Sequence, residues 1–339
     1  MEIKRILVSR TDKIGDLVLS IPSFFMLKKM YPEAEITVLV RKYNYEIVKN
    51  LPYVDRVIKI DDYTEKSLID KIGYFKADVF IALYNDSFVS KLVKKSGAKI
   101  KIGPYSKLSS FFVFNKGVYQ KRSKSIKNEA EYNLDLVKRL DPVLFKKNYE
   151  LNTEIVLEDK NREVATLFYS NNISLGKKVL VINPFMGGSA KNLKDSQYNS
   201  LMKKILDRDS DIDIILTVHI TDEERAEKLL EGLDSKRIHV FANGGELLNT
   251  AAIIEKCNLY LGGSTGPTHI AGALQKEIVA IYPNMKTQSP KRWGVFGNNK
   301  VEYLIPDYKN KKENYSHKEF DSYNEDLENL LVKTILKKI

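Results

Sequence analysis

The sequence contains one cysteine, four histidines and no long apolar run, and each scarcity argues against a class of protein. The single cysteine, Cys257, excludes a disulfide-built scaffold and any zinc site made of cysteines. Four histidines leave little material for a histidine-rich metal site. No apolar segment reaches the ~18 residues that a membrane-spanning helix needs. Charges interrupt the N-terminus, MEIKRILVSRTDKIGD, so we expect no signal peptide and a reducing cytoplasm as the setting.

The composition that remains is that of a folded globular protein, with 43% hydrophobic and 29% charged residues. At roughly 150 residues per domain, the 339 residues suggest two domains. The 55 lysines and arginines exceed the 44 acidic residues, which gives a formal net charge of +11 at pH 7. This charge fits an anionic substrate, a membrane surface or a nucleic acid, and does not choose among them.

Short β-branched runs alternate with helical stretches, starting at residues 3–9 and resuming at 178–183 after an aperiodic segment. This alternation is typical of parallel βαβ units, hence of open α/β sheets. Two such sheets facing each other would leave a cleft at the carboxyl ends of their strands, where these folds bind ligands. We predict two Rossmann-like domains and a final helix, with bounds at 1–165, 166–315 and 316–339.

The first loop of interest, RTDKIGD, follows the first strand. Gly15 permits a sharp turn or the close approach of a ligand. Asp16 starts the following helix, where a carboxylate either caps the helix or serves as a general base at the mouth of the cleft. Asp12 is the competing candidate for the base.

The second loop, NPFMGGSAK, lies between a strand and a helix, and includes Gly187 and Lys191. Small residues that end in a lysine suit a phosphate group, because backbone N–H groups approach it and the lysine supplies charge. The spacing is not that of a P-loop. A flexible turn with a solvated lysine is an equally good interpretation of this loop alone.

The third loop, GGSTGPTH, follows a strand and opens a helix with Pro267 in its first turn. The N–H groups of that turn, with the hydroxyls of Ser264 and Thr265, predict an anion site. His269 lies one turn into the helix, where it is either a packed residue or part of the site. The order of the glycines does not match the dinucleotide-binding pattern.

Together these loops resemble the motifs of glycosyltransferase family 9, the ADP-heptose:lipopolysaccharide heptosyltransferases. The opening segment resembles the family's strand, Gly-Asp loop (Gly15-Asp16), helix with an early proline (Pro22) and aromatic-Pro-x-Ala-x-Ile segment (Tyr31–Ile36). GGSTGPTHIAGAL resembles the signature D-[ST]-G-x-x-H-x-A-x-A-L. NPFMGGSAKNL resembles the family's phosphate-binding loop, with Lys191 at the lysine position. The resemblance runs in order over most of the chain.

The resemblance implies a GT-B fold, in which the C-terminal helix packs back on the first domain. It implies that residues 1–165 bind the acceptor and residues 166–315 the nucleotide sugar. The reaction implied is an inverting transfer of a heptose-type sugar, with ADP-heptose as the donor, to a lipopolysaccharide or lipooligosaccharide core. Neither a metal nor a cofactor is implied, and the protein is expected to be cytoplasmic and peripheral at the inner membrane.

The resemblance also assigns roles to single residues. Asp16 becomes the general base that takes the proton of the acceptor hydroxyl. In the family an acidic residue after the second strand of the second domain contacts the nucleotide, and Asp222 is our candidate; an acidic helix N-terminus is the alternative. Ser264 replaces the family's usual aspartate, and Asn128 replaces the histidine that opens the helix before the linker. The donor site implied comprises Gly187, Lys191, Asp222, Ser264, Thr265, Gly266 and His269.

Residues 105–127 interleave five aromatic residues with lysines and arginines and show no clear period. We expect Lys121, Arg122 and Lys124 to bind an anionic glycolipid acceptor, and the segment to meet the inner-membrane surface. The same pattern suits single-stranded nucleic acid or membrane interfaces, and it also fits a surface loop with its aromatics packed beneath it.

Two alternatives to heptosyl transfer stay open. One is a GT-B transferase that uses another nucleotide sugar and a non-lipid acceptor. The other is a basic nucleic-acid-binding protein, although we expect no nucleic acid as a partner. Asp211-Ile212-Asp213 has the letters of a metal-binding D-x-D motif, but it precedes or opens a strand, so we expect no divalent metal.

Overall fold

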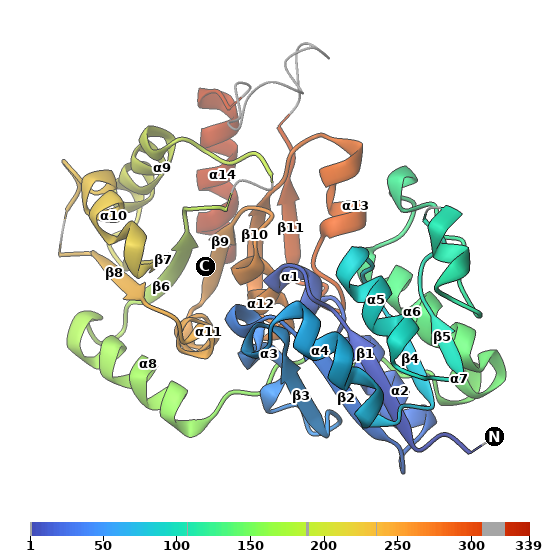
Figure 1. Ribbon diagram of the computed structural model, residues 1–339. Helices are drawn as coiled ribbons and strands as arrows, with labels where there is room; N and C mark the ends of the chain where they lie inside the picture. The colour runs from blue at the N-terminus through green and yellow to red at the C-terminus, as the bar shows by residue number, and fades with distance from the viewer. Residues whose placement is uncertain (1, 107, 188–189, 235, 307–322) are drawn as a thin grey trace. The chain divides into compact units, whose positions relative to one another are not determined.

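A computed structural model describes residues 2–106, 108–187, 190–234, 236–306 and 323–339. The chain divides into two compact units, Met1–Val156 and Leu157–Ile339. Each unit is built around its own parallel sheet (Figure 1). The predicted α/β class is therefore confirmed. None of the helices in the described ranges has the length and apolarity to cross a membrane.

The sheet of the first unit has five strands in the order β3-β2-β1-β4-β5. β1 pairs in parallel with β2 on one side and β4 on the other, so loops after β1 and β4 start at the same edge. Burial of every residue of β1 after Arg5 is what a parallel sheet covered on both faces requires. The strands are β1 (Arg5–Ser9), β2 (Glu35–Val40), β3 (Arg56–Lys59), β4 (Val79–Ala82) and β5 (Ile100–Ile102).

The helices of the first unit are α1 (Ile14–Val18), α2 (Ile21–Met30), α3 (Glu46–Lys49), α4 (Glu65–Lys71), α5 (Ser87–Lys95), α6 (Glu129–Leu140) and α7 (Pro142–Asn148). Short 3-10 helices are η1 (Lys42–Asn44), η2 (Ile60–Asp62), η3 (Ile72–Phe75), η4 (Leu108–Phe112) and η5 (Arg122–Lys124). Residues 16–30 do not form one continuous helix but are divided between α1 and α2, because Pro22 has no N–H to donate within a continuous helix.

The sheet of the second unit has six strands in the order β11-β10-β9-β6-β7-β8. Its central strands β9, β6 and β7 are neighbours, so the loops that follow them leave the same edge side by side. The strands are β6 (Lys178–Asn183), β7 (Ile212–His219), β8 (Ile238–Asn243), β9 (Leu259–Gly262), β10 (Glu277–Ile281) and β11 (Val301–Leu304).

The helices of the second unit are α8 (Asp159–Asn172), α9 (Asp195–Arg208), α10 (Glu223–Leu229), α11 (Leu247–Lys256), α12 (Gly266–Ala273), α13 (Pro290–Trp293) and α14 (Glu325–Lys338), with 3-10 helices η6 (Ile220–Asp222) and η7 (Lys286–Gln288). The predicted boundary at residue 165 falls inside α8. This helix joins the second unit because Asn161 donates to Asn249 of α11 at 2.7 Å and Arg162 pairs with Glu255 at 3.0 Å.

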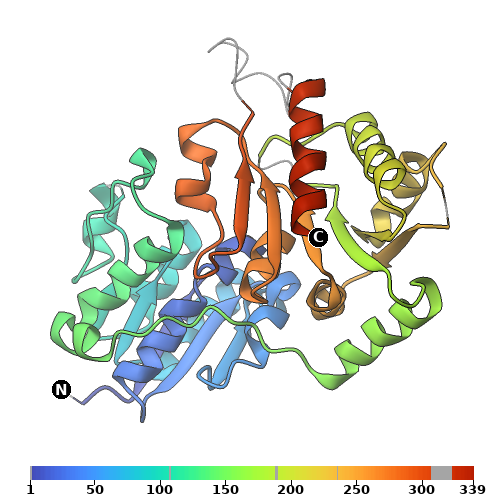
Figure 2. The ribbon, with the colours of Figure 1, turned by 180° about the vertical axis from the view of Figure 1, so that it is seen from behind.

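The C-terminal helix α14 packs on the second unit, so the prediction that it returns to the first domain is wrong. Leu331, Val332 and Ile335 are fully buried in the core of the second unit. Lys338 pairs with Glu277 at the start of β10 at 3.3 Å. Figures 1 and 2 show α14, in red, beside the orange strands from both sides. The apolar side of this helix is thus buried against the second unit. The predicted helix also included residues 316–322, which lie outside the described residues.

Candidate active site

A buried arginine lies at the edge of the first sheet where β1 and β4 end, and it binds several polar side chains there. Arg10, which directly follows β1, has a side chain only 1% exposed. Its Nη2 lies 2.5 Å from Oδ1 of Asp16, and its Nε lies 2.7 Å from Oδ1 of Asp12. Its Nη1 donates to Oδ1 of Asn133 on α6 at 3.1 Å. The structure therefore brings both predicted candidates for the base onto one guanidinium.

Asp16 is held on one side only. Its side chain is 12% exposed, and Arg10 occupies Oδ1. In the described part of the chain no hydrogen bond or ion pair reaches its Oδ2. The backbone is fixed as well, because Ser20 Oγ donates to the Asp16 carbonyl at 2.8 Å and in turn accepts from Asn133 at 3.1 Å. One carboxylate oxygen is thus left to receive a proton.

Asp12 contacts the same guanidinium through its own Oδ1. Burial raises the pKa of the Asp12 carboxyl to about 7, although the Arg10 guanidinium opposes this. Its carbonyl oxygen accepts hydrogen bonds from the Tyr43 hydroxyl and from Asn44. A carboxyl whose pKa lies near the working pH can act as a general base, so Asp12 stays the competing candidate.

A second ion pair lies behind Arg10. Glu129, the first residue of α6, has a side chain 1% exposed, and its Oε1 lies 3.5 Å from Arg10 Nη1. The same oxygen pairs with Arg122 of η5 at closer range. The Leu83 carbonyl, just after β4, accepts from both arginines at 3.3 Å. The sequence analysis did not single out Arg10 or Glu129. The position of a charged residue directly after a buried strand would have pointed to Arg10.

The three predicted acceptor residues are not equivalent. Lys121 and Lys124 are exposed. Arg122 is instead bound within the first unit, to Glu129, to the Leu83 carbonyl and to Gln120 Oε1 at 2.8 Å. A buried carboxylate thus already pairs with this arginine, and its role as an acceptor ligand stays a prediction.

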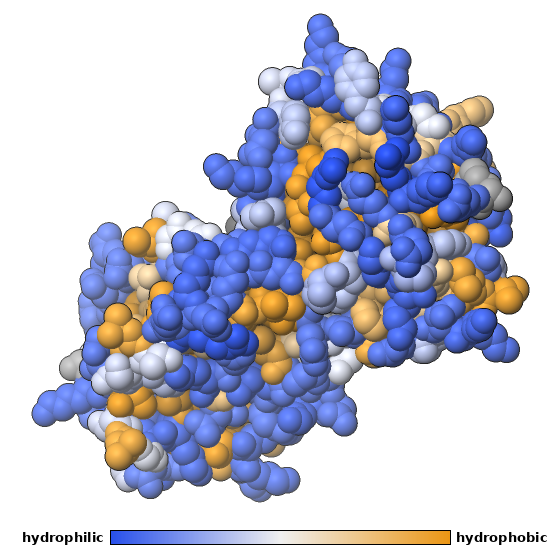
Figure 3. All heavy atoms as spheres, turned by 90° about the horizontal axis from the view of Figure 1, so that it is seen from below, coloured by the Kyte–Doolittle hydropathy of each residue, from blue (hydrophilic) through white to orange (hydrophobic). Residues whose placement is uncertain are grey.

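The aromatic residues of segment 105–127 divide into a packed and an exposed set. Phe114 is 2% exposed, and Tyr105 packs against the core and stacks on Phe111 at 4.2 Å between ring centroids. By contrast Leu108 is 84%, Phe112 82% and Tyr119 72% exposed. The interpretation as a fully packed surface loop therefore does not hold for η4. On the face drawn in Figure 3, most of the surface is hydrophilic, and apolar residues form separate patches.

In the second unit the predicted donor residues follow three adjacent strands. Gly187 and Lys191 follow β6, Asp222 ends η6 after β7, and Ser264, Thr265, Gly266 and His269 follow β9. The loops after β6 and β9 touch, because a Cβ built on Gly263 would lie 2.7 Å from Met186 Sδ. The structure thus gathers the predicted residues at one edge of the sheet.

The loop after β9 is shaped for an anion. Thr268 Oγ1 donates to the Gly263 carbonyl at 2.6 Å, which closes the turn. Thr265, the N-cap of α12, makes no side-chain cap hydrogen bond, so no capping side chain takes up the first N–H groups of this helix. Lys191 is 4% exposed, so the adjacent loop carries a buried cation. Together they provide donors and charge for a phosphate.

Ser264, which stands where the related family has aspartate, acts as a hydrogen-bond donor. The buried Tyr282 hydroxyl donates to the Trp293 carbonyl at 2.9 Å, and it accepts a hydrogen bond from Ser264. A carboxylate cannot make that donation. The hydroxyl at position 264 is therefore matched to Tyr282, a residue that sequence reasoning did not single out.

His269 is 5% exposed, and in the described ranges no hydrogen bond reaches its Nδ1. Burial lowers the pKa of His269 from 6.5 to about 4, so the imidazole is neutral at pH 7. A neutral, unpaired ring nitrogen close to the first turn of α12 suits a supporting contact to the anion loop.

The pKa of His269 predicts a pH-dependent stability. Below pH 6.5 the His269 imidazole of the unfolded chain takes up a proton, whereas in the folded state it does so only near pH 4. The free energy of unfolding therefore falls as the pH is lowered from 6.5 to about 4. At ~1.4 kcal/mol per pH unit the loss is about 3 kcal/mol. Urea unfolding at pH 7.5 and 4.5 should show a weaker pH dependence in His269→Gln, and the exposed His219→Gln serves as control. Equal slopes in wild type and His269→Gln would contradict the buried neutral state.

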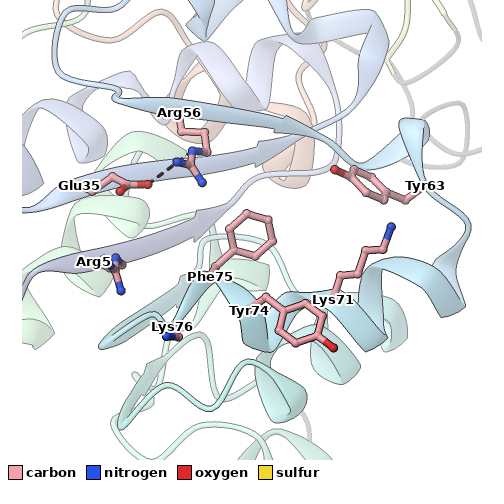
Figure 4. A pocket seen from close by; sticks show the side chains of 8 residues that line it. All are labelled: Arg5, Glu35, Arg56, Tyr63, Lys71, Tyr74, Phe75 and Lys76. Atoms are coloured by element: carbon pink, nitrogen blue, oxygen red, sulfur yellow. Dashed lines mark ion pairs between the residues drawn. The ribbon is translucent and has the colours of Figure 1, made fainter.

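A cavity of about 480 Å³ lies apart from these residues. It lies in the first unit, where Arg5, Glu35 and Arg56 start their strands and the crossover from β3 to β4 covers them (Figure 4). Glu35 pairs with Arg56 at 3.5 Å, and Lys71 lies over the Tyr63 ring. Across the described ranges, no group of three or more His, Cys, Asp or Glu side chains could hold a metal ion.

Comparison with known proteins gives consistent likenesses. Residues 66–324 match the model of glycosyltransferase family 9 (heptosyltransferase). A Haemophilus influenzae protein that bears the name of a glycosyltransferase is 32% identical over 86% of this chain and 85% of its own length. Lipopolysaccharide heptosyltransferase 3 of Escherichia coli is 21% identical over 87% of each chain.

Solved structures show the same fold. The family 9 glycosyl transferase of Veillonella parvula superposes with a TM-score of 0.84 at 18% identity, covering 100% of this chain and 99% of its own. The ADP-heptose lps heptosyltransferase II of E. coli gives 0.79 at 16% identity, covering 99% and 98%. The predicted GT-B fold is confirmed by these likenesses.

Proposed function

The chain belongs to glycosyltransferase family 9 (heptosyltransferase), and from this premise we propose that it transfers a heptose-type sugar from ADP-heptose to a lipopolysaccharide or lipooligosaccharide core. That it is a glycosyltransferase enzyme follows from the family; the donor, the acceptor and the roles of single residues are our proposal. The observation that carries it is Asp16, bound by Arg10 through Oδ1 and unpaired at Oδ2 within the described residues.

In this proposal Asp16 takes the proton of the acceptor hydroxyl as that oxygen attacks the anomeric carbon. The bond from the anomeric carbon to the diphosphate oxygen breaks as the new glycosidic bond forms, so the configuration inverts. Arg10 pairs with the carboxylate through Oδ1 and fixes its orientation, which leaves Oδ2 to accept the proton. Asp16 thus acts as a general base and forms no bond to the sugar.

The second unit would stabilise the leaving nucleoside diphosphate, which gains negative charge as the bond breaks. The N–H groups at the start of α12 and the Lys191 ammonium supply donors and a positive charge that are in place before reaction. His269 supports the loop, and Asp222 is proposed to contact the nucleotide. Gly266 lets the phosphate approach the backbone closely.

A binding screen tests the donor. The apo protein is titrated with ADP, UDP, GDP and CDP by calorimetry, and ADP is expected to bind at least tenfold more tightly than the others. Preference for another nucleotide would overturn ADP-heptose as the donor and favour transfer of a different sugar. The Ser264→Asp variant, measured in the same screen, asks whether the hydroxyl at this position sets the preference.

We propose that no divalent metal takes part, because a lysine and helix N–H groups can offset the charge of the leaving group. Turnover should therefore stay within twofold when excess chelator is added. Loss of activity with chelator, followed by recovery with Mg²⁺ or Mn²⁺, would contradict this. The same assay on a metal-dependent glycosyltransferase confirms that the chelator is effective.

We also propose that the protein works at the cytoplasmic face of the inner membrane and meets its acceptor there. The exposed apolar side chains of η4, with Lys121 and Lys124 nearby in sequence, combine insertion and attraction to anionic head groups. Lys116 and Lys127 contribute less, because Lys116 donates to the Leu140 carbonyl and Lys127 pairs with Asp135.

Replacing two of these apolar side chains should weaken membrane binding. Burial of one large apolar side chain is worth about 1.5–3 kcal/mol, so Leu108→Ser with Phe112→Ser should reduce binding to anionic vesicles at least tenfold. Vesicle sedimentation measures this, and Tyr74→Ser, which removes an aromatic side chain 81% exposed, is the matched control. Nucleotide affinity should not change. Equal binding by both variants would show that η4 does not meet the membrane.

A further inference from the structure

The segment that carries the exposed basic residues is joined to the proposed base by a continuous set of ion pairs. From η5, Arg122 pairs with Glu129, Glu129 lies 3.5 Å from Arg10, and Arg10 lies 2.5 Å from Asp16. The side chains of Arg10 and Glu129 are each 1% exposed, so water does not screen this part of the set. None of the motifs in the sequence links Arg122 to the Gly15-Asp16 loop.

The distances show how the charge is divided. Glu129 Oε1 is closer to Arg122 than to Arg10, whereas Arg10 makes its short contacts to Asp12 at 2.7 Å and Asp16 at 2.5 Å. Arg122 therefore satisfies Glu129, and the Arg10 guanidinium is left for the two aspartates. If Arg122 were neutral, the buried Glu129 would lose its shortest ion pair and would draw the Arg10 guanidinium away from Asp16.

Arg122 itself is held in place by its neighbours. Its Nε donates to Gln120 Oε1 at 2.8 Å, and Gln120 Nε2 donates to the Tyr132 carbonyl on α6 at 2.6 Å. The guanidinium also lies 5.6 Å from the centroid of the Tyr132 ring. These contacts fix the guanidinium in a geometry that a flexible surface arginine would not keep.

We propose that Arg122 and Glu129 are positioning residues for the base: by pairing with each other they reserve Arg10 for Asp16. The proposal rests on the proposed function, in which Asp16 is the base. It replaces the interpretation of Arg122 as an acceptor ligand, and it makes the geometry of the base depend on the 120–124 segment beside the exposed apolar residues.

The charge balance around the aspartates gives the expected pH effect. Arg10 faces Asp16, Asp12 and Glu129, and Arg122 faces Glu129; Tyr43 on η1 and Tyr84 after β4 lie farther out. Arg41 and Asp61 lie beyond Tyr43, and Asp86 beyond Tyr84. In Arg122→Gln one arginine would serve three carboxylates, so this set as a whole takes up a proton at higher pH.

The test compares single and double variants that remove the charges of Arg122 and Glu129, and it measures kcat and the pH–rate profile of the full-length protein with donor and acceptor. Arg122→Gln should lower kcat about tenfold to a hundredfold, since a small misplacement of a reacting group is costly. It should also move the acidic limb of the pH–rate profile up by about one pH unit. The double variant Arg122→Gln/Glu129→Gln removes both charges, returns Arg10 to the aspartates, and should recover most of the kcat and the original limb. Arg122→Lys keeps the charge and should leave the limb unmoved.

Several results would overturn the proposal. A higher acceptor KM with kcat and the acidic limb unchanged would mean that Arg122 binds the acceptor directly. Equal impairment of single and double variants would mean that the pair only supports the fold, and thermal unfolding of each variant identifies that case. Arg139→Gln, an exposed arginine on α6, is the matched control and should change neither readout. If Arg122→Gln does not fold, the comparison of Arg122→Lys with the double variant still decides.

The two levels of inference fail separately. Asp16→Asn with normal turnover would remove the base from the proposed function, whatever Arg122 does. An inactive Asp16→Asn together with a normal kcat and pH profile in Arg122→Gln would overturn only the positioning role.

Discussion

Replacement of Asp16 by asparagine is expected to lower turnover by about 10²–10⁴-fold, with donor affinity little changed. Asparagine has nearly the same shape, and its amide oxygen can still accept the hydrogen bond that Arg10 Nη2 gives to Oδ1. What it lacks is the second carboxylate oxygen that would receive the proton. The loss should therefore appear in kcat, measured at saturating donor and acceptor, while calorimetry with ADP reports unchanged binding.

Two comparisons sharpen the Asp16 experiment. Asp70→Asn, an exposed position on α4, removes the same charge from the first unit and should have no effect. Asp12→Asn leaves the base in place and should cost less than Asp16→Asn, because Arg10 Nη2 still holds Asp16 through Oδ1. Near-normal turnover in Asp16→Asn, or a larger loss in Asp12→Asn, would transfer the role of base to Asp12.

Replacement of Lys191 by glutamine is expected to lower kcat/KM by about 10²–10³-fold, the usual cost of losing one donor that stabilises developing negative charge. Lys191 is 4% exposed in the loop after β6, which touches the loop after β9 that we propose binds the diphosphate. A buried ammonium acts on a leaving diphosphate through little water, so its charge is weakly screened. Steady-state kinetics with varied donor should show part of the loss in KM and part in kcat.

The matched control for Lys191 is Lys203→Gln, an exposed lysine on α9 of the same unit. It removes one positive charge at a distance from the loop and should leave kcat/KM unchanged. If Lys191→Gln behaves like this control, the N–H groups of α12 alone hold the diphosphate, and the lysine serves the fold of its loop.

The order of strands and helices could largely be predicted from the sequence, because burial of parallel strands on both faces demands continuous apolar runs. The run at β1 and the run at β6 are of this kind, and both were predicted. The final strand β11 and the helix α7 were missed. β11 is an edge strand of four residues with only Leu304 buried, so its pattern is weak. α7 begins with Pro142, and a proline after a helix is typical both of the end of that helix and of the first turn of a new one.

The sequence by itself determined which loops we propose for the chemistry: Gly15-Asp16 after the first strand, and the loops of Lys191 and Thr265-Gly266 in the second unit. Parallel strands place successive loops at one edge, so position after a strand is enough to group them. Only the tertiary structure decided how Asp16 is held, that Arg122 is paired inside the first unit, and that α14 stays on the second. These outcomes depend on which buried charges meet and which apolar faces remain to be covered. Arg10 is 119 residues from Glu129 along the chain, and no local pattern encodes their contact.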